Sequence, residues 1–164
     1  MNKIYSIIAS FFLLSVPTIQ PTNNNSHVIH EPIKVTVEET NLKNGRIDTR
    51  EELIEALIYI ESSNNDTALN KKENALGCIQ IRPIMLREVN RILKKSGSDE
   101  RFKMKDRKNR NKSIRMFNIW ADAYHKPSSF EKMARNWNGG PKGYKKSKTE
   151  KYWTKVKNYA KANL

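Results

Sequence analysis

Cysteine and histidine are scarce in this sequence, and their scarcity excludes several kinds of site. Cys78 is the only cysteine among 164 residues, so no intramolecular disulfide can form, and we expect a small buried hydrophobic residue there. His27, His30 and His125 show no spacing typical of metal ligands or of a nucleophile triad. The glycines at 139–140 lack the lysine and hydroxyl residue of a phosphate-binding loop. We therefore expect no metal and no cofactor.

Long hydrophobic runs are also missing, except for one at the N-terminus. Lys3 precedes an apolar run of about 13 residues, Ile4 to Val16, which ends at Pro17. A membrane-spanning helix needs roughly 20 apolar residues, whereas a basic residue before a short apolar run is typical of a signal peptide. Because the small residues of a cleavage site are missing, residues 1–20 are interpreted as a signal peptide or an uncleaved anchor. The protein is expected to be exported to the periplasm or cell envelope, either secreted or N-terminally anchored.

Positive charge is what the chain has in excess. It contains 31 Lys and Arg against 17 Asp and Glu, a net charge of +14. Residues 101–164 hold 19 of the basic residues and only 4 of the acidic ones. Such a surplus attracts polyanions, namely nucleic acid, anionic lipid or an acidic cell-wall polymer, although a merely solvated basic face is equally compatible with it. Export argues against nucleic acid.

The length and the 37% of hydrophobic residues fit one domain with one core. Residues 21–48 are polar and form a predicted linker or arm, with one alternating patch near Ile33. Thr49 and Glu52 have the spacing of a capping box that starts a helix ending near Ser63. Four more helices are predicted. The second runs from Pro83 to just before Ser96, and the third from near Ile114 to Tyr124. The fourth runs from Ser128, with Glu131 three residues later, to Trp137, and the last from Thr149 to near Ala160.

These signals predict a mainly α domain of five to six short helices over residues 49–164. The highly charged segment 101–112 is predicted to be an exposed loop or a frayed helix. Tyr152 and Val156 lie on one face of the last helix, a spacing more typical of a core than of a site.

Glu61 is the most informative residue for function. It follows Leu57 by four residues and Ile54 by seven, which places its carboxyl on the face of the helix that turns inward. Desolvation, the negative end of the helix dipole and the lack of Lys or Arg between residues 51 and 70 would all raise its pKa. A carboxyl that is neutral near physiological pH is a general acid. The alternative is that Glu61 points from the helix end into water.

Three short motifs follow one another in the sequence: Glu61-Ser62-Ser63, then Gly77-Cys78-Ile79-Gln80-Ile81-Arg82-Pro83, and then Asn136-Trp137-Asn138-Gly139-Gly140. In this order they resemble the lytic transglycosylases, whose motifs read roughly E-S-S, G-L-M-Q-I-x-P and A-Y-N-A-G. Each motif alone is weak, but the order and spacing are specific. The resemblance covers about residues 53–156 and leaves the arm and segment 101–112 uncovered.

The resemblance implies a lysozyme-like fold and a role for each matching residue. Glu61 would be the single catalytic acid and base. Ser62 and Ser63 would close the helix end, and one of their hydroxyls would bind the carboxyl or the sugar. Gly77 would let the backbone approach the glycan. Gln80 and Asn138 would bind sugar hydroxyl or acetamido groups, although a surface amide and a helix C-cap are their plain structural alternatives.

One departure from the family pattern concerns the residue that holds the catalytic acid. Where the family has a tyrosine before the asparagine, this chain has Trp137, whose indole N–H can donate a hydrogen bond but cannot accept one. Trp137 could equally be a core residue. Aromatic platforms for the apolar faces of sugars are expected from Trp137, Tyr144, Tyr152 and Trp153.

The sequence thus predicts a monomeric peptidoglycan lytic transglycosylase that cleaves the bond between N-acetylmuramic acid and N-acetylglucosamine and leaves 1,6-anhydro ends. Its expected partners are glycan strands and, through the basic C-terminal third, anionic wall polymers. Two alternatives stay open. One is a hydrolytic muramidase in which Asp66 or Glu73 orients a water molecule, and the other is a non-catalytic, basic wall-binding protein.

Overall fold

The computed structural model describes residues 45–164, so the predicted signal segment and most of the predicted arm lie outside the described residues. Within this range the chain is mainly helical, as predicted. The elements are α1 (Arg50–Ser62), β1 (Leu69–Asn70), β2 (Ala75–Leu76), α2 (Pro83–Lys95), the 3-10 helix η1 (Met104–Lys108), α3 (Arg110–Tyr124), α4 (Phe130–Gly139), the 3-10 helix η2 (Gly143–Lys145) and α5 (Lys148–Asn163). No helix of residues 45–164 is long and apolar enough to cross a membrane.

The helices form where the sequence predicted them, with shifted ends. Helix α3 begins at Arg110 and not near Ile114, α4 ends at Gly139 and not at Trp137, and α5 begins at Lys148, one residue before Thr149. The capping box of α1 is confirmed: the Thr49 hydroxyl accepts from the Glu52 N–H at 3.1 Å, and the Glu52 carboxylate accepts from the Thr49 N–H. Pro83 starts α2 as predicted. The N-cap of α4 is Ser129 and not the predicted Ser128, because the Ser129 hydroxyl is the one that reaches the Lys132 N–H, at 3.3 Å.

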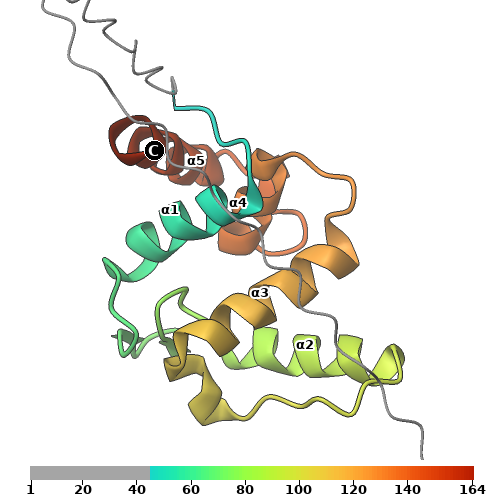
Figure 1. Ribbon diagram of the computed structural model, residues 1–164. Helices are drawn as coiled ribbons and strands as arrows, with labels where there is room; N and C mark the ends of the chain where they lie inside the picture. Colours follow the sequence, from blue (N-terminus) through green and yellow to red (C-terminus); the bar gives the residue numbers. More distant parts are fainter. Residues whose placement is uncertain (1–44) are drawn as a thin grey trace, which may run out of the picture. The chain divides into compact units, whose positions relative to one another are not determined.

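The helices form two groups (Figure 1). Helix α1 packs on α5 and α4, whereas α2 packs on α3. Leu53 and Leu57 of α1 are fully buried, and each such side chain stabilises the fold by about 1.5–3 kcal/mol relative to an exposed one.

Cys78 is also fully buried, as predicted, and burial raises the pKa of its thiol. The hairpin formed by β1 and β2 links the C-terminal end of α1 to the N-terminal end of α2.

The segment 101–112 differs from the predicted exposed loop or frayed helix. It contains η1, in which Asp106 and Arg107 are buried. The Arg107 guanidinium donates to the backbone carbonyls of Asn74 at 2.6 Å and Ile81 at 2.9 Å. These hydrogen bonds hold η1 against the hairpin turn and the segment that follows β2. These two carbonyl groups compensate for the desolvation of the Arg107 cation. Their contact with Arg107 joins residues far apart in the sequence, so the local charge pattern does not reveal it.

Gly77 shows why η1 can approach the hairpin so closely. Its φ is +89°, a left-handed conformation that favours glycine, and a Cβ at this position would lie 1.7 Å from the Arg107 carbonyl oxygen. The close approach that requires Gly77 is therefore made by the protein's own backbone, and not by a glycan as the resemblance implied.

Candidate active site

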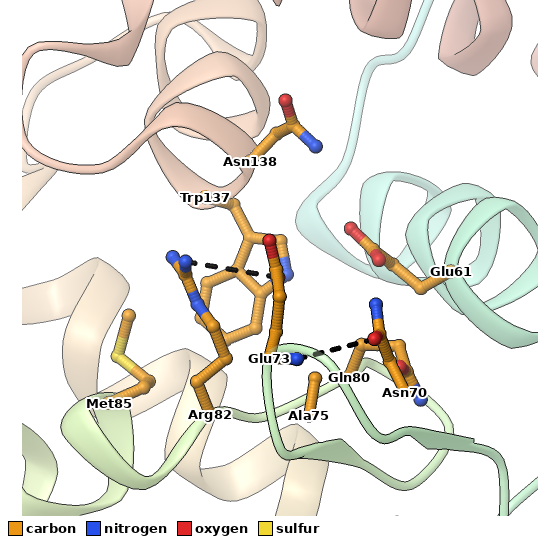
Figure 2. A pocket seen from close by; sticks show the side chains of 9 residues that line it. All are labelled: Glu61, Asn70, Glu73, Ala75, Gln80, Arg82, Met85, Trp137 and Asn138. Atoms are coloured by element: carbon orange, nitrogen blue, oxygen red, sulfur yellow. Dashed lines mark hydrogen bonds and ion pairs between the residues drawn. The ribbon is translucent and has the colours of Figure 1, made fainter.

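Glu61 lies in the last turn of α1 and lines a small pocket between α1, the hairpin, the start of α2 and the end of α4 (Figure 2). The other lining residues are Asn70, Glu73, Ala75, Gln80, Arg82, Met85, Trp137 and Asn138. The Glu61 side chain is half-buried, and its carboxyl faces the space beneath Asn138. The structure therefore places Glu61 in a concave site, and not free in solvent at the helix end.

The electrostatics of the pocket favour the neutral form of Glu61. Burial is the main cause, and it raises the pKa of the carboxyl above its ordinary value of 4.5. The hydrogen bond from Tyr152 and the charge of Arg82 act in the opposite direction, and the nearby Glu73 adds to the increase. The predicted lack of Lys and Arg holds for residues 51–70 of the sequence, but the fold brings Arg82 to the same pocket.

Tyr152 supplies the phenol that is absent beside Asn138. It comes from α5, is buried, and donates a hydrogen bond from its hydroxyl to Oε1 of Glu61 at 2.7 Å. Burial and the adjacent carboxyl raise the pKa of Tyr152 well above its ordinary value, so the phenol stays protonated and remains a donor. Tyr152 does not line the pocket and so acts through Glu61 as a positioning residue. The hydrogen bond leaves Oε2 of Glu61 as the oxygen that can hold the acidic proton.

Gln80 and Asn138 are both brought to the pocket, on opposite sides of Glu61. The Gln80 amide nitrogen donates to the carbonyls of Ala68 and Gly77, each at 3.0 Å, which fixes the side chain and leaves its oxygen as the group that can accept from a ligand. Asn138 lies inside α4 with an exposed side chain, and Gly140 is the C-cap. The alternative in which Asn138 is a helix C-cap is therefore wrong.

Ser62, Ser63 and Gly77 are not among the residues that line this pocket. The Ser62 hydroxyl donates to the Ile58 carbonyl at 3.0 Å and accepts from the Asn65 N–H at 3.1 Å. Ser63 is the C-cap of α1, with a left-handed φ of 51°. The two serines do close the helix end, as the motif implied, but their contacts are to backbone and not to the Glu61 carboxyl.

Trp137 is both a core residue and a wall of the site. Its ring packs edge-on against Phe117 at 5.0 Å and Trp120 at 5.1 Å between ring centroids, and it is buried. It also lines the Glu61 pocket from behind (Figure 2). Because aromatic neighbours fix its ring, Trp137 can present a rigid apolar surface to a ligand.

The fold also brings together residues that the motifs did not single out for a role. Arg82 and Glu73 line the pocket and form a loose ion pair at 3.9 Å, and Asn70 and Met85 complete the wall. Asp66 is placed elsewhere, in an ion pair with Arg110 at 2.9 Å. Of the two carboxylates considered for a hydrolase, only Glu73 therefore shares the pocket with Glu61. The position of Arg82 next to Pro83, inside a matching motif, was the signal that could have revealed it.

We expect Tyr152→Phe to lower kcat by roughly 10-fold, because the carboxyl loses the contact that orients it. The hydrogen bond favours the ionised form of Glu61, so its removal raises the pKa of Glu61 further. If Glu61 acts as the expected general acid, activity needs its protonated form, and the alkaline limb of the pH–activity profile should move to higher pH. Rates of peptidoglycan cleavage, the activity that the motifs imply, measured across pH test both effects.

Tyr159→Phe is the matched control for this experiment. Tyr159 also lies on α5, and its hydroxyl donates at 3.0 Å to a carboxylate of α1, that of Glu55, but neither residue lines the pocket. Its loss should leave kcat and the pH profile unchanged. An unchanged pH profile for Tyr152→Phe, or an equal effect of the two variants, would contradict the positioning role.

The chemistry that this pocket offers is proton transfer by the carboxyl of Glu61, with Glu73 as a second carboxylate in the lining. Glu61 is held by a neutral phenol, faces neutral amides and has an aromatic wall beside it. In the described range 45–164, the structure gathers no three His, Cys, Asp or Glu side chains that could hold a metal ion.

Comparisons of the chain with protein families, with curated proteins and with solved structures found no match.

Proposed function

We propose that this protein is a peptidoglycan lytic transglycosylase with a lysozyme-like fold. The observation that carries the proposal is Glu61, a half-buried carboxyl of raised pKa that a buried tyrosine holds in a pocket lined by amides and an indole. The order of the three motifs supports the same function. A general acid is the group that glycosidic bond cleavage needs first, because the leaving oxygen must receive a proton.

In the proposed reaction, Glu61 donates the proton of its free oxygen to the glycosidic oxygen while the bond to the sugar's C1 breaks. The acetamido group of the substrate bonds to C1 in the intermediate, as the resemblance implies. Ionised Glu61 then takes the proton of the C6 hydroxyl, whose oxygen attacks C1 and displaces the acetamido oxygen. The product is a 1,6-anhydro sugar, and Glu61 ends the cycle protonated, with no water consumed.

The remaining pocket residues suit a saccharide. Gln80 and Asn138 offer neutral amide groups, which bind hydroxyls without desolvating a charge. Trp137 provides an apolar wall against which the C–H face of a sugar ring can pack. In this proposal the protein is exported as a monomer and acts on glycan strands in the cell envelope.

A turnover assay tests the proposed function. Purified protein lacking residues 1–20 should release soluble muropeptides from isolated sacculi. Binding to sacculi without any release would favour the non-catalytic wall-binding protein instead.

The hydrolytic muramidase is a second candidate, and one observation favours it. Glu73 shares the pocket with Glu61, and its side chain is 53% exposed, so this carboxylate could orient a water molecule. The ion pair with Arg82 at 3.9 Å competes with a water molecule for the Glu73 carboxylate. The chemistry of the released chain ends distinguishes the two candidates.

The basic surface should raise the rate of encounter with the wall and not the rate of the chemical step. Helix α5 carries a set of exposed lysines: Lys148, Lys151, Lys155, Lys157 and Lys161. Salt screens such charges over a Debye length of about 8–10 Å. Cleavage of sacculi should therefore fall severalfold as ionic strength rises, whereas cleavage of a short neutral glycan should fall much less. Equal salt sensitivity of the two substrates would contradict this prediction.

A further inference from the structure

A second and larger cavity adjoins the Glu61 pocket. Its volume is about 740 Å³, and it shares three lining residues with that pocket, Arg82, Met85 and Trp137. It lies between the first half of α2, the end of α3, and α4 with the loop that follows it. The two pockets therefore share a wall, and they lie next to each other on the protein.

The walls of the cavity are largely apolar and aromatic. Trp120 and Trp137 line it with their ring centroids 5.1 Å apart, and Tyr144 and Ile84 also line it. Ile84 is 64% exposed, so its side chain is open to a ligand. These walls suit a ligand with small apolar side chains.

The charges at the cavity favour an anion. Arg82 and Lys132 line it, and Lys132 lies 4.9 Å from the centroid of the Tyr144 ring. Glu88 is the one carboxylate among the lining residues, but Arg91 holds it through two hydrogen bonds of 2.7 and 2.9 Å. The Tyr124 hydroxyl also binds Glu88, and these contacts lower the pKa of Glu88 to about 2. Arg82 pairs loosely with Glu73 at 3.9 Å, so Lys132 is the lining cation that no carboxylate of the described residues pairs with.

His125 adds a buried polar group without a side-chain partner. It lines the cavity and is only 5% exposed, and its Nδ1 forms no hydrogen bond with any residue of the described part. Burial and the charge of Lys132 lower the pKa of the imidazole, so the ring is neutral. Its ring packs on Trp120 at 4.5 Å between centroids. A buried polar group that the protein leaves unpaired is costly, and a polar ligand would reduce that cost.

We propose that this second cavity binds the peptide stem of the peptidoglycan strand by a carboxylate and its small apolar side chains. The inference rests on the proposed function, because it concerns the same substrate. It follows from charge complementarity: a neutral glycan would leave Lys132 without a carboxylate partner, since Arg82 already pairs loosely with Glu73. A stem peptide carries both carboxylates and alanine side chains. The cavity would then make cleavage depend on the peptide and not on the sugars alone.

The kinetic test compares two substrates that differ only in the peptide. Glycan strands are isolated with their stems, and one half is treated with an amidase that removes them. For the parent protein we expect kcat/KM to be about 10-fold higher on strands with stems. This ratio corresponds to about 1.4 kcal/mol of additional transition-state binding. In Lys132→Gln this ratio should fall toward one. Lys95→Gln, which removes the same charge from the exposed end of α2 outside both pockets and outside the lysine set of α5, should keep it.

A binding test separates this inference from the proposed function, because it needs no turnover. The probe is the free tetrapeptide stem, added to isotope-labelled Glu61→Gln protein in which the His125 ring signals are followed by NMR. The stem should shift these signals, and its affinity should drop at least 10-fold when its carboxylates are amidated or Lys132 is replaced by Gln. Failure of the stem to shift the His125 signals, or equal affinity of the amidated stem, would overturn the inference even if the protein cleaves glycan. Binding without cleavage would leave the peptide site in place and reject the transglycosylase.

Discussion

Replacement of Glu61 by glutamine is expected to abolish release of muropeptides from sacculi. Glutamine keeps the size of the side chain and can still accept the hydrogen bond of Tyr152, but it has no proton of suitable acidity for the leaving oxygen. General acid–base catalysis contributes about 10²–10⁴ in rate, and no second carboxyl can replace it from the same position. The measurement is the initial rate of release by purified parent and variant at the same concentration.

The matched control is Glu55→Gln. Glu55 lies on the same helix and also accepts a hydrogen bond from a tyrosine of α5, but its side chain is exposed and does not line the pocket. This variant should retain the parent's rate. A well-folded Glu61→Gln protein that keeps full activity would remove Glu61 from the mechanism.

The stability of Glu61→Gln against pH gives an independent check of the site. Because the pKa of Glu61 is raised in the folded protein above 4.5, the fold binds this proton more tightly than the unfolded chain does. The stability that this carboxyl contributes is fully present below about pH 4.5 and is lost as the pH rises through the raised pKa. Glu61→Gln should therefore have a higher Tm than the parent at neutral pH, and the difference should shrink in acid.

The helices were largely predictable because their signals are local. The Thr49 and Glu52 capping box, the proline at the start of α2 and the apolar stripe of α5 each depend on residues within a few turns. The error at Ser128 arose because two adjacent serines offer the same cap, and only the geometry of the entering chain selects Ser129. The hairpin of β1 and β2 escaped prediction since its strands are only two residues each.

The site was predictable only as far as the motifs reach. Glu61, Gln80 and Asn138 meet in one pocket, as their order in the sequence suggested. The contact of Tyr152 with Glu61 joins residues 91 positions apart, and the spacing of Tyr152 favoured a core residue. Arg107 was similarly hidden, because its partners are backbone carbonyls, which carry no signature in the sequence.

The chain ends of the product should separate the transglycosylase from the hydrolase. The C6 hydroxyl belongs to the sugar that is being cleaved, so it has a large effective concentration over water once the pocket is filled. We therefore expect the released muropeptides to carry 1,6-anhydro ends, each lighter by one water than the hydrolytic product. Mass spectrometry of muropeptides from purified sacculi measures this directly.

The role of Glu73 decides how that result is interpreted, because it is the second carboxylate of the pocket. If Glu61 alone moves protons, Glu73→Gln should retain turnover and anhydro ends, and Asp66→Asn should behave in the same way, since Asp66 pairs with Arg110 outside the pocket. If Glu73 orients a nucleophilic water, Glu73→Gln should lose about 10²-fold or more in rate, while Asp66→Asn remains active. Reducing ends in the product together with that loss would assign the protein to the hydrolytic muramidases. Anhydro ends with an active Glu73→Gln variant would show that the reaction does not need Glu73, whose contact in the pocket is then the ion pair with Arg82 at 3.9 Å.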